Sequence, residues 1–174
     1  MPIQNVYMNQ GTWIFENDNT IPHGSDSYMM AGVMYTGKCR PLINFNNDGF
    51  SGQILGGSLF VYCSNPNGYP WIWGYRVTRD YYHNATWSIP WTTPGCDHVW
   101  ADRSDIRLFT STRAKSGWIE MPVADLTELL NVINGKDTIL LVGGDAPAAR
   151  IEKSPAPYLA IEYRSSLVGG VQII

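Results

Sequence analysis

Apolar and polar residues alternate with a period of two along most of this chain, which is the pattern of strands with one face on a core. In residues 54–63, for example, Leu59, Val61 and Cys63 fall on one face. Glycine, proline, asparagine and aspartate gather between such segments, as is typical of turns. The pattern predicts strands over residues 12–15, 28–35, 39–45, 54–63, 71–78, 106–110, 117–121, 138–142 and 158–163.

One segment follows a helical period instead. Asp125 is a good N-cap residue, and Glu128 lies three positions later, as in a capping box. Gly135 is well placed to end the helix. The apolar positions between them lie at i, i+3, i+4 and i+7 and form one face, made of Leu126, Leu129, Leu130 and Ile133.

Short strands at this spacing, with a single helix, predict an all-β fold: an antiparallel, jelly-roll-like β-sandwich with one short α-helix packed against it. The 174 residues suit one domain, which we place at residues 1–163. The Ser-Ser and Gly-Gly pairs that follow indicate a C-terminal extension or linker over residues 164–174. The side chains expected in the core are Val61, Val77, Trp87, Leu129, Leu140 and Ile161.

The charge and composition of the chain limit the classes of binding partner. The formal net charge is -3 and the 12 basic residues are scattered, which argues against nucleic acid as a partner. No window approaches the length of apolar chain that spans a membrane, so we expect no membrane partner. The first residues lack the basic and apolar regions of a signal peptide. We expect Cys39, Cys63 and Cys96 to be free buried thiols, with a disulfide between two of them left open.

A series of short motifs in residues 28–163 resembles the carbohydrate-binding-module-like domains known as DNRLRE domains. The central one is Val77-Thr78-Arg79-Asp80 followed by Thr86-Trp87. An Arg-led strand over residues 40–45 and a closing strand over residues 157–163 also resemble the family. The other matching segments are residues 54–62, 118–131 and 137–142. The resemblance implies a β-sandwich of the kind found in phage fibres and in secreted polysaccharide-active proteins.

The resemblance and the missing signal peptide together indicate a non-enzymatic structural or attachment module of a virion, such as a capsid decoration, head-fibre or tail-fibre protein. Such a protein is made in the host cytoplasm and reaches the virion by assembly. Its expected partners are other virion proteins or further copies of itself, together with host surface glycans. The alternative is a carbohydrate-binding module of a secreted polysaccharide-active protein.

Aromatic side chains are the candidate ligand contacts, because indole and phenol rings stack on the apolar faces of sugars. Trp71 and Trp73 lie on one face of a predicted strand, although such a row commonly fills a core. Residues 88–100 form a proline- and glycine-containing loop, which suits ligand capture but also suits self-packing or a subunit interface. The candidates in this loop are Trp91, Trp100, Asp97 and His98.

Other chemistry has weaker support. Cys96, His98 and His83 provide too few ligands at the spacings that zinc requires. The clusters Asn17-Asp18-Asn19 and Asn44-Asn46-Asn47-Asp48 could hold structural calcium, but turn formation is the commoner explanation. No nucleophile–base pair or carboxylate pair is apparent, so we expect no catalytic residues and no cofactor.

Overall fold

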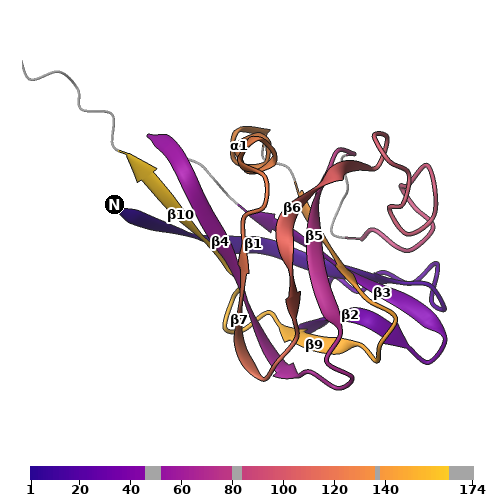
Figure 1. Cartoon of the computed structure of the whole chain (residues 1–174). Helices are drawn as coiled ribbons and strands as arrows, with labels where there is room; N and C mark the ends of the chain where they lie inside the picture. Colours follow the sequence, from indigo (N-terminus) through magenta and orange to yellow (C-terminus); the bar gives the residue numbers. More distant parts are fainter. Residues whose placement is uncertain (46–51, 80–83, 136–137, 165–174) are drawn as a thin grey trace, which may run out of the picture.

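The computed structural model describes residues 1–45, 52–79, 84–135 and 138–164. This part of the chain forms ten strands and one short helix (Figure 1). The elements are β1 (Ile3–Phe15), β2 (Tyr28–Met34), β3 (Gly37–Phe45), β4 (Gln53–Asn65), β5 (Trp71–Val77), β6 (Arg103–Arg113), β7 (Gly117–Pro122), α1 (Leu126–Gly135), β8 (Thr138–Gly143), β9 (Ala149–Glu152) and β10 (Tyr158–Arg164).

All nine strands predicted from the sequence are present, and the all-β character is confirmed. The first strand starts at Ile3, well before the predicted residue 12, and β9 was not predicted at all. Arg164 ends β10, and residues 165–174, the rest of the predicted extension, lie outside the described residues. The same is true of Asp80 and His83, which the sequence analysis singled out.

The predicted jelly-roll-like sandwich is wrong, because six strands close into an antiparallel barrel. The ring runs β1–β10–β4–β9–β2–β3 and returns to β1. Strands β8, β5 and β6 continue the sheet from β3 in that order. Strand β7 pairs with β4 (Figure 1). In a sandwich, the two packed sheets would not be joined by hydrogen bonds into such a closed ring of strands.

Two strands close the ring by changing partners along their length. The first half of β1 pairs with β10 and its second half pairs with β3, with an irregular step between Met8 and Gln10. Strand β2 pairs with β9 as far as Ala31 and with β3 from Gly32 onward. Gly32 has φ 127°, and a Cβ there would lie 2.9 Å from the carbonyl oxygen of Ala146. Only glycine fits this corner.

The main hydrophobic core draws on every strand and on the helix. A second, smaller core lies where residues 84–102, in the loop between β5 and β6, cover side chains of β1, β3, β5 and β8. All six predicted core residues are buried: Val61, Leu129 and Ile161 in the main core, and Val77, Trp87 and Leu140 in the second. The three cysteines are also buried, and each is unpaired.

Helix α1 packs over β4, β5 and β6. The side chain of Asp125 accepts a hydrogen bond of 2.9 Å from the amide of Glu128, which confirms the predicted N-cap. Leu129 and Ile133 are buried as expected, whereas Leu126 remains 39% exposed. Glu128 turns toward β5 and forms an ion pair of 3.1 Å with Arg76. No helix in the described ranges has the length and apolar character needed to cross a membrane.

Candidate functional site

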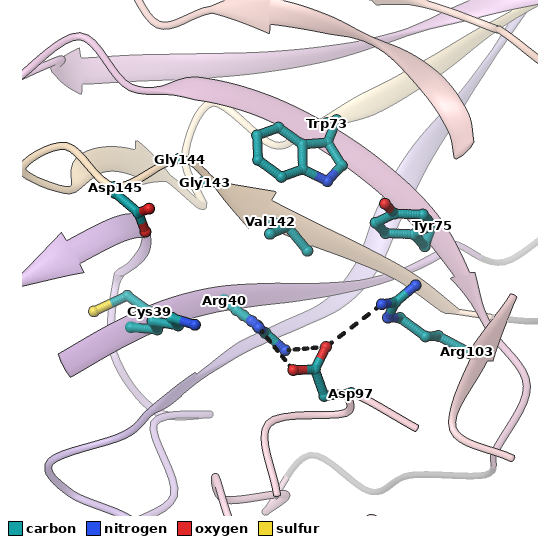
Figure 2. A pocket seen from close by; sticks show the side chains of 11 residues that line it. Cys39, Arg40, Trp73, Tyr75, Asp97, Arg103, Val142, Gly143, Gly144 and Asp145 are labelled. Atoms are coloured by element: carbon teal, nitrogen blue, oxygen red, sulfur yellow. Dashed lines mark hydrogen bonds and ion pairs between the residues drawn. The ribbon is translucent and has the colours of Figure 1, made fainter. Parts of the chain in front are cut away.

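A recess of about 300 Å³ lies beside loop 84–102, on the face of β3, β8 and β5 turned away from the main core (Figure 2). Ile72 and Leu141 point from these strands into the core, so their neighbours Trp73 and Val142 point the other way. The residues that line the recess are Lys38, Cys39, Arg40, Trp73, Tyr75, Asp97, Arg103, Val142, Gly143, Gly144 and Asp145.

Asp97 of loop 84–102 lies between two guanidinium groups at one end of the recess (Figure 2). Arg40 of β3 places Nη1 3.3 Å from Oδ1 and Nη2 3.4 Å from Oδ2 of this carboxylate. Arg103 of β6 places Nη2 3.4 Å from Oδ1. The trio joins two strands to the loop and carries one positive charge in excess.

These charges keep Asp97 ionised. Burial alone would raise the pKa of this carboxyl group, but the charges and hydrogen bonds of Arg40 and Arg103 outweigh that effect and lower the pKa below its ordinary value. A general acid at neutral pH needs the opposite shift. Asp97 is therefore suited to accepting hydrogen bonds and not to donating a proton.

Cations lie over both aromatic rings of the recess. The guanidinium carbon of Arg103 is 4.3 Å from the centre of the Tyr75 ring, and that of Arg107 is 5.1 Å from the centre of the Trp73 ring. Both distances are within the range of cation–π contacts. These contacts hold the rings in fixed orientations on β5, so the recess has a largely preformed wall.

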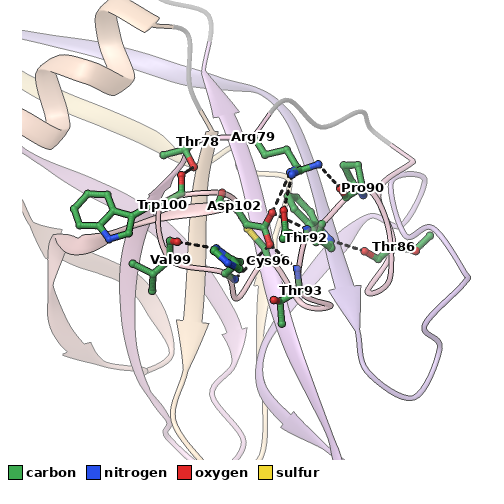
Figure 3. A network of polar contacts seen from close by, with 12 residues as sticks. Thr78, Arg79, Thr86, Pro90, Thr92, Thr93, Cys96, Val99, Trp100 and Asp102 are labelled. Carbon is green, nitrogen blue, oxygen red and sulfur yellow. Dashed lines mark hydrogen bonds and ion pairs between the residues drawn. The ribbon is translucent and has the colours of Figure 1, made fainter.

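Loop 84–102 is organised around the carboxylate of Asp102, which is fully buried (Figure 3). It accepts hydrogen bonds from the amides of Thr92, Thr93 and His98 at 2.8, 2.9 and 3.3 Å. It also forms an ion pair of 3.0 Å with Nε of Arg79. Burial would raise the pKa of Asp102, but the amide hydrogen bonds prevail and lower it. The loop that carries Asp97 is thus fixed from its own interior.

Trp91 lies in the second core and is only 6% exposed. Its indole Nε1 donates a hydrogen bond of 2.8 Å to the carbonyl of Thr86. The ring of Trp91 is therefore enclosed by the loop, and its contact with a ligand stays a prediction. The sequence could not show this enclosure, because an irregular loop has no periodicity that distinguishes inside from outside.

Three of the other predicted contacts, Trp71, His98 and Trp100, are exposed and do not line the recess. Trp100 is 67% exposed and projects from the loop at φ 73° (Figure 3). His98 lies nearby, with Nδ1 2.8 Å from the carbonyl of Val99. Trp71 is 52% exposed at the start of β5, outside the recess. Of the six predicted residues, only Trp73 and Asp97 lie in the recess together.

Sequence reasoning missed Arg40, Arg103 and Tyr75 as members of the site. One signal was available: Arg40 lies between Cys39 and the apolar run Pro41-Leu42-Ile43, and a buried arginine requires a partner. That partner, Asp97, lies far along the chain. Tyr75 is half-buried on the recess wall.

A second aromatic surface lies on the outer side of β1, β10, β4 and β7, where five rings form a continuous row. Phe60 and Tyr158 stack with their centroids 4.9 Å apart. Trp118 meets Tyr158 edge-on at 5.4 Å, and Tyr7 lies 5.5 Å from Tyr158 on its other side. Tyr62 completes the row beside Trp118. Tyr7 and Trp118 are the most exposed members.

Residues 1–45, 52–79, 84–135 and 138–164 contain no group of three or more His, Cys, Asp or Glu side chains placed to hold a metal ion. His83, one of the three candidates for zinc, lies outside these ranges. Cys96 is deeply buried, and burial raises the pKa of its thiol, which is the reverse of what a nucleophile needs.

The sequence matches no protein-family model and no curated protein. Membership of the DNRLRE-type family therefore stays a prediction.

Proposed function

We propose that this protein is a non-enzymatic module that binds a glycan in the recess beside loop 84–102. The observation that carries the proposal is the convergence of Trp73 and Tyr75 with Asp97 and two arginines in one cavity. Apolar walls with a few fixed polar groups are typical of small-molecule sites. Sugars need both, because their ring faces are apolar and their hydroxyl groups must be hydrogen-bonded.

A binding role fits the electrostatics better than a catalytic one. Asp97 has a lowered pKa and is paired with Arg40 and Arg103, so it is a poor proton donor. Asp145, the other carboxylate of the recess, lies toward its opposite end (Figure 2). An ionised carboxylate can instead accept hydrogen bonds from sugar hydroxyl groups.

The test compares two tryptophans of β5 on an array of oligosaccharides, followed by calorimetry. Trp73→Ala should abolish binding, since it removes the recess wall, whereas Trp71→Ala should bind as the unchanged protein does. Both side chains lie on the same face of one strand, so the pair is closely matched. Absence of binding to every glycan, or equal losses for the two variants, would overturn the proposal.

We further propose that the module serves attachment in a virion, as the motifs in the sequence indicate. The exposed aromatic row on β1, β10, β4 and β7 supports contact with a second copy of the chain, because exposed apolar surface of this kind is enriched at interfaces. Light scattering after size exclusion should give an oligomer, and Trp118→Ser should reduce it to a monomer. A monomeric unchanged protein would instead favour the alternative, a binding module of a secreted polysaccharide-active protein.

A further inference from the structure

The recess has an excess of positive charge that a neutral sugar would leave without a counterion. Lys38, Arg40 and Arg103 line it, against the two carboxylates of Asp97 and Asp145. The positive charge is uneven along the recess, since both guanidinium groups lie at the Asp97 end (Figure 2). In a chain whose formal charge is -3, this is a local reversal of sign.

At the Asp97 end of the recess, the protein does not use every N–H donor of Arg40 and Arg103. A guanidinium group has five N–H bonds. Arg103 uses one on the carbonyl of Ser104 and one on Asp97. Arg40 uses one on the carbonyl of Gly95 and one on Asp97, and its Nη1 also lies 3.3 Å from Oδ1 of Asp97. One N–H bond therefore remains on each Nη atom of Arg103.

Arg103 is the better placed of the two to reach a ligand. Its side chain is 15% exposed, compared with 7% for Arg40, and its guanidinium carbon lies 4.3 Å from the centre of the Tyr75 ring. The planar guanidinium group presents parallel N–H bonds, a geometry that matches a carboxylate. Trp73 and Val142 form the apolar wall next to it, where the ring that bears the carboxylate can lie.

We propose that the recess recognises an acidic sugar, whose carboxylate is bound by Arg103 while its ring lies against Trp73. This inference rests on the proposed glycan binding and specifies the class of glycan. Asp145 and the end of β8 then face the far side of the sugar, where neutral hydroxyl groups can donate to a carboxylate. Asp97 remains ionised between the arginines and keeps Arg103 in position.

The experiment uses pairs of oligosaccharides that differ only in charge: oligogalacturonate, oligoglucuronate and oligomannuronate, each as the free acid and as the methyl ester. Titration calorimetry at low salt measures binding to the unchanged chain. We expect at least one free acid to bind about tenfold more tightly than its ester, with the preference declining as salt is added. Because this comparison uses the unchanged chain, it does not depend on the folding of a variant.

Two variants test whether Arg103 is responsible for the preference for the acid over the ester. Arg103→Gln should weaken binding of the free acid more than binding of the ester, so that the difference between them falls to about twofold or less. Arg113→Gln, which removes a cation from the other end of β6, should keep the full preference. Equal weakening of acid and ester by Arg103→Gln would overturn the inference, because it would show a merely structural role.

Two further outcomes separate this inference from the proposal on which it rests. If neutral oligosaccharides bind in the recess and no acid binds better than its ester, the acidic preference is wrong and glycan binding stands. If no oligosaccharide of either kind binds, the proposed function itself is wrong. Tighter binding of a sulfated oligosaccharide than of any uronate would overturn the assignment of the anion as a carboxylate.

Discussion

Nη1 of Arg40 donates a hydrogen bond of 2.6 Å to the carbonyl oxygen of Gly95, which ties the middle of β3 to loop 84–102. The same guanidinium lies 5.2 Å from the centre of the Trp87 ring and binds Asp97. One buried cation therefore holds the second core and the recess together. The loop that forms one side of the recess is positioned by contacts with residues more than fifty positions earlier.

Gly95 should be intolerant of any side chain. It has φ 85°, and a Cβ there would lie 2.6 Å from Cζ2 of Trp87. We expect Gly95→Ala to lower the free energy of unfolding by about 2–4 kcal/mol, from left-handed strain and overpacking together. Gly117 is a matched control, since it has φ 91° and open space around its Cα. Denaturant titration should show a loss of about 1–2 kcal/mol for Gly117→Ala; equal losses would contradict the clash.

The carboxylate of Asp102 should make the free energy of unfolding depend on pH. The folded state lowers its pKa, so the stabilisation is complete above the pKa of the unfolded chain and is lost as the pH falls through the folded value. We expect the free energy of unfolding to decline below about pH 4. Asp102→Asn should cost about 2–3 kcal/mol at neutral pH and flatten that decline. Asp105→Asn, an exposed neighbour, should leave the profile unchanged; an unaltered profile in Asp102→Asn would exclude this role.

Helix α1 should contribute to the stability of the fold through its buried face alone. Leu129 is fully buried in the main core, whereas Leu126 is 39% exposed. We expect Leu129→Ala to lower the free energy of unfolding by about 2–5 kcal/mol through cavity formation. Leu126→Ala should change it by less than about 1 kcal/mol, since alanine is the better helix former. Thermal and denaturant unfolding would measure both, and similar effects at the two positions would contradict the packing of α1.

The thiols should be unreactive until the protein unfolds. Burial raises the pKa of Cys39 to about 12, and it also raises the pKa values of Cys63 and Cys96. A thiol reagent needs the thiolate and physical access, and the native state denies both. We expect a disulfide reagent to label none of the three in the native protein and all three in denaturant. Labelling of Cys96 under native conditions would mean that loop 84–102 opens readily.

Residue types and their neighbours in the sequence identified only some of the residues of the candidate site. Trp73 and Asp97 were identified from their types and surroundings, and they lie together in the recess. Trp91 was chosen on the same grounds, yet it is buried against Thr86. Arg103 and Tyr75 were missed because their significance comes from a contact between two strands, β5 and β6, that the period of each strand does not encode.

The sequence alone determined nine of the ten described strands, the helix with its Asp125 cap, and the six core residues, because these depend on the spacing of apolar residues and on local hydrogen bonds. Tertiary structure decided that the strands close into a barrel and that Arg40, Asp97 and Arg103 meet. Alternation shows which face of a strand is buried, but it does not show which strand lies beside it. In this chain that choice depends on the partner changes of β1 and β2, at an irregular step and at the Gly32 corner.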